Sequence, residues 1–393
     1  SWPLMREGWT VNHYAVAKAV RSGQFECLKQ LLAHNDLGNQ QWPNEQDGWT
    51  INHFAVQKAV LHGKFECLKQ LLAHNDLGKQ TWQAKPDGWT INHYAISLLA
   101  KNGKLEDLPQ LLAHNDLGNQ PWQGKPDGWT INHYVITLFA KNGKFEYLRQ
   151  LLEQNNFGNQ QWPNAPGGLT INHFAVQQTV KNGKFECLKQ LLAHNDLGNQ
   201  QWPGECEGII INQCAIYLAA KFGKSECLLK LLAYNDLYSQ RWPNMSEGWT
   251  MKHYAVNVAG KFGKFECLKQ LLAYNDLGNQ QWPGERRHCT INQFAVTQLV
   301  VCGKYECLQQ LLKDEDLGNE AWPGEPDGWT VNHYAVLIAA TRGKYECLQQ
   351  LLAHKDLGNQ QWPNEQVGWT MNYFAVQKVA RYGKFECLKQ LLA

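Results

Sequence analysis

Apolar side chains form a helical stripe within each stretch of 40 residues, and residues 48–87 show it clearly. Over residues 52–61, the apolar positions fall at i, i+1, i+4 and i+5, the spacing that places side chains on one side of an α-helix. These positions are Ala55, Val56, Ala59 and Val60. We therefore expect a first amphipathic helix in this segment.

A second stripe follows Gly63, which interrupts the first helical pattern. Over residues 64–74, Phe65, Leu68 and Leu72 fall at i, i+3 and i+7, which again marks one side of a helix. The next stretch, LGKQTWQAKPDG, is rich in turn-forming residues. The pattern predicts a second helix and then a long loop.

The block GWTINHFAV recurs in recognisable form every 40 residues without insertion or deletion. Fixed spacing of this kind indicates units that bury their apolar faces against one another, because one helix pair cannot bury its own. We therefore expect a single solenoid over residues 1–393. Its ten copies span residues 1–39, 40–79, 80–119, 120–159, 160–199, 200–239, 240–279, 280–319, 320–359 and 360–393.

Each copy carries a tryptophan in its loop. A buried ring removes roughly 150 to 250 Å² from water, which contributes at most about 4 to 6 kcal/mol. We expect the ring to anchor the loop onto its neighbours; the alternative is an exposed aromatic ladder that binds sugars or bases. The positions are Trp2, Trp42, Trp82, Trp122, Trp162, Trp202, Trp242, Trp282, Trp322 and Trp362.

The conserved spacing within the copies resembles the ankyrin repeat, whose signature runs Gly-x-Thr-Pro-Leu-His-x-Ala, then Gly, then an apolar helix ending in Leu-Leu. The matching residues are Gly48, Thr50, His53, Ala55, Gly63, Leu71 and Leu72. Ile51 and Asn52 stand where the family has Pro-Leu. Four more residues before Gly63 and three more in the loop extend the family period of about 33 residues to 40.

This resemblance implies an all-α solenoid of ten tandem ankyrin-like helix-turn-helix repeats with long connecting loops. It also implies that the first helices line a concave surface where partners bind. A two-helix solenoid of the HEAT or armadillo kind, whose period is also near 40, is the alternative. We expect structural roles for Trp42, Thr50, His53, Gly63 and Leu68.

Seven histidines recur once per copy, which raises the question of a metal site. Neighbouring copies lie about 10 Å apart by helix packing, and other residues replace histidine at Gln213, Gln293 and Tyr373, so a shared metal centre is not expected. The resemblance instead implies hydrogen bonds between histidine and threonine at the helix start. The histidines are His13, His53, His93, His133, His173, His253 and His333.

Eight periodic cysteines lie beside the apolar stripe of the second helix and are expected to be small buried residues in a reducing compartment. They are Cys27, Cys67, Cys187, Cys227, Cys267, Cys307, Cys347 and Cys387. The four irregular cysteines, Cys206, Cys214, Cys289 and Cys302, lack the C-x-x-C spacing of zinc sites. We expect Glu26 and its equivalents to form surface ion pairs with Lys29 and its equivalents, three positions later on the same helix.

No nucleophile elbow, phosphate loop or paired-carboxylate constellation occurs, so neither an enzyme, a cofactor nor a small-molecule substrate is expected. The formal charge of +2 gives no support for a nucleic-acid partner, and no apolar run is long enough for a membrane helix. The expected location is the cytoplasm.

The copies differ most at the positions of Ala17, Lys18, Arg21 and Ser22, which helix geometry places opposite the apolar stripe. We interpret this variable face as the binding face, because neutral drift would also vary the second helix, which is nearly constant. Its basic and aromatic character suits an acidic protein segment. The candidate partner-binding residues are Lys101, Lys141, Lys181, Tyr217, Lys221, Phe222, Asn257, Lys261 and Phe262.

The sequence thus favours a non-catalytic protein-binding scaffold or adaptor. The first and last copies are as apolar as the others, whereas a solitary solenoid needs polar ends. The alternative is therefore a structural protein that binds further copies of itself end to end and forms a fibre or filament.

Overall fold

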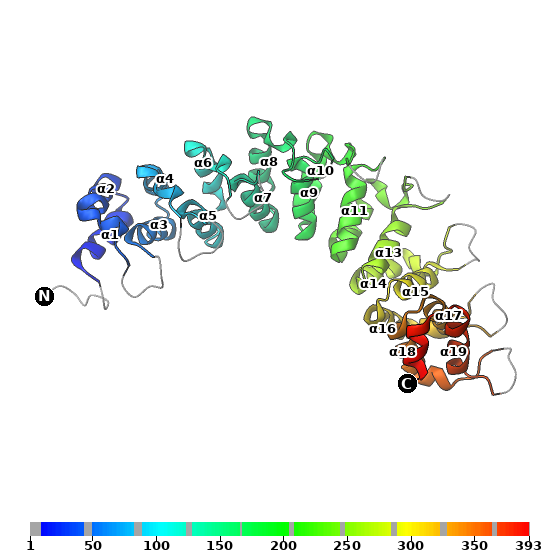
Figure 1. Cartoon of the computed structure of the whole chain (residues 1–393). Coiled ribbons are helices and arrows are strands. Elements are labelled where there is room, and N and C mark those ends of the chain that lie inside the picture. The colour runs from blue at the N-terminus through cyan, green and yellow to red at the C-terminus, as the bar shows by residue number, and fades with distance from the viewer. Residues whose placement is uncertain are drawn as a thin grey trace. The chain divides into compact units, whose positions relative to one another are not determined.

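Helices, turns and loops make up the residues that the structure, a computed structural model, describes (Figure 1). Strands are absent from these ranges, and helix pairs repeat along the chain, which confirms the predicted all-α solenoid. The structure describes residues 9–42, 49–81, 89–122, 128–165, 167–203, 208–243, 248–283, 289–322, 328–363 and 368–392.

The first helix of each copy is 11 or 12 residues long. In the type copy, its stripe includes Val56, which is fully buried, and Gly63 lies past its end with a left-handed φ of +64°. These helices are α1 (Val11–Ser22), α3 (Ile51–Leu61), α5 (Ile91–Lys101), α7 (Ile131–Asn142), α9 (Ile171–Lys181), α11 (Ile211–Phe222), α13 (Met251–Lys261), α15 (Ile291–Val301), α17 (Val331–Arg342) and α19 (Met371–Arg381).

The second helix of most copies is 9 residues long and buries its leucines, such as Leu68, which is 1% exposed. These helices are α2 (Phe25–Ala33), α4 (Phe65–Ala73), α6 (Leu108–Ala113), α8 (Phe145–Glu153), α10 (Phe185–Ala193), α12 (Ser225–Ala233), α14 (Phe265–Ala273), α16 (Tyr305–Lys313), α18 (Tyr345–Ala353) and α20 (Phe385–Leu392).

Helix α6 is shorter than its counterparts because of Pro109. Proline has no backbone N–H and its ring collides with the carbonyl one turn earlier. The preceding turn, Leu105–Asp107, accordingly adopts 3-10 geometry and α6 begins only at Leu108.

The chain divides into two compact units, residues 1–178 and 179–393, with the division inside α9. In the second unit, the first helices pack in one row, which consists of α11, α13, α15, α17 and α19. The second helices pack in another row, which consists of α12, α14, α16, α18 and α20. Neighbours in the first-helix row contact one another more extensively than neighbours in the second-helix row. Closer packing makes the first-helix row the inner side of this unit.

The loop between copies is more ordered at both ends than the sequence predicts. Its first six residues form a 3-10 turn, as in His34–Asn39, where Asn35 and Asp36 adopt left-handed φ values of +49° and +56°. Asparagine and aspartate tolerate this region better than other non-glycine residues. The same turn occurs in the next eight copies, from His74–Lys79 to His354–Asn359.

The far end of the loop closes as a hairpin-like connection. Gln41 pairs with Thr50 in an isolated antiparallel bridge, and the Trp42 N–H donates to the Trp49 carbonyl over 2.8 Å. The Ile51 N–H donates to the Gln40 carbonyl over 3.0 Å. A proline in place of Ile51 has no N–H, so this departure from the signature supplies a hydrogen bond.

Candidate functional site

A threonine and a histidine fix the start of each first helix. In α3, the Thr50 N–H donates to Nδ1 of His53 over 3.2 Å, and the Thr50 Oγ1 lies 2.9 Å from the same nitrogen. Burial lowers the pKa of His53 to about 4, so the ring is neutral and Nδ1 is an acceptor. Gln213 replaces histidine in α11 and accepts the Ile210 N–H through Oε1 over 3.0 Å.

The loop tryptophan joins one copy to the next through a cluster of rings. Trp42 is 5% exposed and stacks on Phe54 of its own copy, with 3.6 Å between ring centres and 13° between planes. From the preceding copy, Trp9 and His13 pack edge-on against Trp42, with 5.0 and 4.8 Å between the ring centres. Parallel stacks recur at Trp242, Trp282, Trp322 and Trp362, whereas Trp2 and Trp82 lie outside the described residues.

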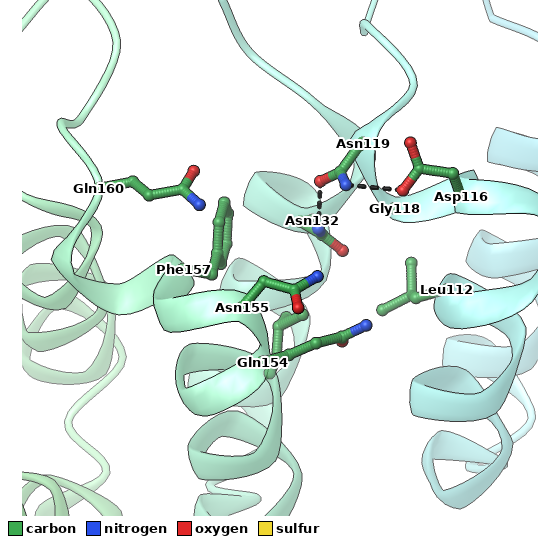
Figure 2. A pocket seen from close by; sticks show the side chains of 10 residues that line it. Leu112, Asp116, Gly118, Asn119, Asn132, Gln154, Asn155, Phe157 and Gln160 are labelled. Carbon is green, nitrogen blue, oxygen red and sulfur yellow. Dashed lines mark hydrogen bonds between the residues drawn. The ribbon is translucent and has the colours of Figure 1, made fainter.

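A polar triad connects the 3-10 turn to the next first helix. In Figure 2, Asn119 donates through Nδ2 to Asp116, and Asn132 of α7 donates to the Oδ1 of Asn119 over 3.1 Å. The Oδ1 of Asn132 lies against Gly118, where a Cβ would overlap it. Glycine is required at position 118 because the Asn132 side chain approaches the backbone closely, and not because the backbone has a positive φ. The triad therefore has the geometry of a structural junction.

The variable face of the second unit brings lysines and aromatic rings together. The Lys221 Nζ lies 5.5 Å from the ring centre of Tyr217 and 5.4 Å from that of Phe262, within cation–π range of both. The Lys261 Nζ lies 6.0 Å from the Phe262 ring, and Lys181 is exposed at the end of α9. Within the described part of the chain, none of these lysines forms an ion pair.

The remaining candidate residues occupy the same helical positions. Phe222 and Asn257 are half-buried in the second unit. Lys101 and Lys141 are exposed at the ends of α5 and α7, in the first unit.

The variable face is narrower than the sequence predicts. Leu218 and Val258 occupy the Lys18 position but are only 4% and 3% exposed. Helices α11 and α13 pack closely against each other, and these apolar side chains belong to their core. The prediction that the Lys18 position faces outward is wrong in these two copies.

The periodic cysteines are packing residues, with one exception. Burial raises the pKa of Cys227 and of Cys267 to about 12, which keeps both thiols protonated and unreactive. Cys27 is exposed, so the prediction that it is buried is wrong. Cys387 is buried in α20, the last described helix, so the cysteine side of a second helix packs against the preceding copy. Cys27 is exposed because no described helix precedes α1 to cover it.

Neither a metal cluster nor a membrane span is found in the described ranges. No group of three or more histidine, cysteine, aspartate or glutamate side chains there is arranged to hold a metal ion. No described helix is both long and apolar enough to cross a bilayer. Cys206, one of the four irregular cysteines, lies outside the described ranges.

Comparison with known proteins gives one family. The family model described as ankyrin repeats (3 copies) matches residues 13–99 and 176–281. Among solved structures, a crystal structure of the human ASB11 ankyrin repeat domain is similar: it is 16% identical, covers 65% of this chain and 96% of that chain, and has a TM-score of 0.33. No curated protein sequence matches the chain.

Proposed function

Because the chain belongs to the ankyrin-repeat family, we propose that it is a non-catalytic protein-binding scaffold that uses the first-helix face of its second unit. Ankyrin repeats in general mediate protein–protein interaction. The observation that carries the proposal is the position of Lys221 between the rings of Tyr217 and Phe262. The binding face is defined by Lys181, Tyr217, Lys221, Phe222, Asn257, Lys261 and Phe262.

The chemistry of this face favours an acidic segment with aromatic or aliphatic side chains. Three lysines without ion pairs among the described residues supply positive charge, which attracts carboxylates and speeds association. Half-buried rings supply the contacts that dominate interface energies, since they are already held in place and lose little entropy on binding. Lys221 holds its ammonium over two ring faces and leaves its remaining hydrogens free for a partner.

A charge-reversal experiment tests the proposal. The probe is a fluorescein-labelled peptide of alternating glutamate and leucine, and binding is followed by fluorescence polarisation at low salt. We expect Lys221→Glu/Lys261→Glu to weaken binding at least tenfold. The matched control, Lys189→Glu/Lys269→Glu, changes the net charge equally on the second-helix row and is expected to have little effect. Equal losses in both variants would contradict a role for the binding face.

End-to-end assembly remains a prediction from the sequence, and it has its own test. Light scattering coupled to size exclusion, over about a hundredfold range of concentration, measures the mass of the particle. A constant mass near 45.0 kDa supports the scaffold, whereas a mass that grows with concentration supports the filament.

We also propose a reducing location such as the cytoplasm. Every cysteine that the structure describes is free, and the periodic ones lie one per second helix. Alkylation of the native protein, followed by mass spectrometry, is expected to find no disulfide; a disulfide between two of these cysteines would contradict this location.

A further inference from the structure

A cavity of about 480 Å³ opens in the second unit, between the turns that follow α13 and α15 and the first turn of α18. Phe262 and Tyr305 contribute aromatic walls, and Glu306 and Glu346 contribute carboxylates from consecutive second helices. Phe262 also belongs to the binding face, so the cavity and the face are continuous.

An uncovered glycine turn gives the cavity its space. At Gly223 and Gly263, the lysine of the next copy covers the turn: the Cδ atoms of Lys264 and Lys304 lie 3.1 and 3.0 Å from where a Cβ would stand. At Gly303, no atom lies within 4 Å of that position. Gly303 therefore forms an open wall of the cavity.

Two departures from the repeat pattern leave the carboxylates without their usual partners. In three other copies, a basic residue three positions later pairs with the glutamate, as in Glu66–Lys69 at 3.0 Å and Glu146–Arg149 at 3.2 Å. The corresponding residues here are glutamines, Gln309 and Gln349. Neither Glu306 nor Glu346 forms an ion pair within the described chain.

The charges of the cavity are complementary to a cation. Its two carboxylates outnumber its one ammonium, that of Lys304, and the lining carries a net charge of −1. The Lys304 methylenes lie over Gly263 and form part of the floor. Tyr305 stands where most copies have phenylalanine, which adds a hydroxyl to the aromatic wall.

We infer that this cavity binds an arginine side chain of a partner protein. A planar guanidinium stacks on aromatic faces and donates to two carboxylates at once, which matches the arrangement of Phe262, Tyr305, Glu306 and Glu346. The inference rests on the proposed function: the partner segment places acidic residues on Lys221 and Lys261 and an arginine next to them in the cavity.

The decisive experiment restores the missing basic residues. Gln309→Lys/Gln349→Lys gives both glutamates the partner that other copies already carry at this position, so the helices are expected to fold normally. The probe is a fluorescein-labelled Gly-Ser-Arg-Ser-Gly peptide, and its neutral counterpart carries citrulline instead of arginine. We expect the unmodified protein to bind the arginine peptide at least tenfold more tightly than the citrulline peptide. We expect the lysine variant to lose that preference.

A second pair of variants separates the cavity from general charge. Glu306→Gln/Glu346→Gln is expected to weaken binding of the arginine peptide at least tenfold. Glu226→Gln/Glu266→Gln removes the same charge from two neighbouring copies and is expected to leave binding within about twofold. Equal weakening by both pairs, or no preference for arginine over citrulline, overturns the inference.

The two proposals fail in different ways. Lys221→Glu/Lys261→Glu is expected to weaken binding of the glutamate–leucine peptide at least tenfold and to keep the preference for arginine over citrulline. If the acidic peptide binds normally to that variant while the arginine preference holds, the proposed function fails and the cavity stands alone. Far-UV circular dichroism verifies the fold of each variant.

Discussion

The Lys252 Nζ lies 4.7 Å from the centre of the Tyr238 ring, at a junction where the other copies pair glycine with asparagine. Elsewhere, a Cβ on the glycine would overlap the asparagine Oδ1. The two residues therefore change together: Tyr238 requires that asparagine be absent, and Lys252 donates instead to the Gln280 Oε1 over 2.9 Å. Ser239 completes the departure, since asparagine occupies that position in most copies.

This relationship predicts strong coupling in a double-mutant cycle. Lys252→Asn alone forces an amide against the Tyr238 side chain, and we expect it to lower the free energy of unfolding by about 1 to 3 kcal/mol. Tyr238→Gly with Lys252→Asn recreates the common junction and is expected to cost less than the sum of the single changes by about 0.5 to 3 kcal/mol. Urea unfolding measures each term. Additive losses would show that the two side chains are independent.

The capping histidines predict acid destabilisation. Burial lowers the pKa of His53, His93, His133 and His253 to about 4, against about 6.5 in the unfolded chain. The unfolded state therefore binds more protons between these values, and stability that is complete above pH 6.5 is lost as the pH falls from 6.5 to 4. Urea midpoints at pH 7.5 and pH 5 are expected to differ markedly.

Glutamine provides the control for this prediction. Gln293 already accepts the Thr290 N–H through its Oε1 over 2.8 Å, without titrating. Replacing the four histidines by glutamine is expected to keep most of the stability at pH 7.5 and to reduce the difference between the two pH values. An unchanged pH dependence would assign acid unfolding to other groups.

Removal of one loop tryptophan tests the ring cluster. Trp282 is 7% exposed and stacks on Phe294 with 3.4 Å between ring centres. We expect Trp282→Ala to cost about 3 to 5 kcal/mol, because it removes a large buried ring and leaves a cavity. Trp282→Phe retains a stacking ring and should cost clearly less. Guanidinium unfolding monitored by circular dichroism compares them, and equal costs would argue against stacking as the source of stability.

Thiol labelling tests the direction in which the second helices pack. Cys27 is exposed, whereas Cys227 is 2% exposed and burial raises its pKa to about 12. Iodoacetamide at pH 8 is expected to modify Cys27 within minutes and Cys227 only after denaturation, as followed by peptide mass spectrometry. Comparable rates in the native protein would mean that α12 opens locally.

Local patterns in the sequence predict the helices well because the same residues recur in each copy. The stripe through Val56 and Leu68 and the break at Gly63 identify both helices of a copy. The sequence does not predict the 3-10 turn after the second helix, since it depends on left-handed backbone at Asn35 and Asp36. Nor does it predict the hairpin-like closure, which forms without the expected proline through the Ile51 N–H.

The candidate site is harder to predict because it depends on contacts between copies. Comparison of copies identifies Lys221 and Phe262 as variable, but only packing shows that the two side chains meet and that Leu218 is buried. The cavity beside Glu306 has a faint signal in the sequence, the change from lysine to Gln309. That signal has no meaning until the neighbouring copy is placed against it.

The stacking of Trp42 bears on how the array changes over generations. Among the described residues, its ring–ring contacts lie within its own copy and the one before it, so a whole copy inserted or deleted in frame places rings of the common type together again at each seam. Unequal exchange between repeated stretches of the coding DNA produces such changes, and their products keep the ring contacts wherever the joined copies carry the common residues. An insertion of one or two residues within a copy instead displaces the tryptophan from its stack. The number of copies is thus the variable that this architecture leaves open to evolution, while the 40-residue period is held constant.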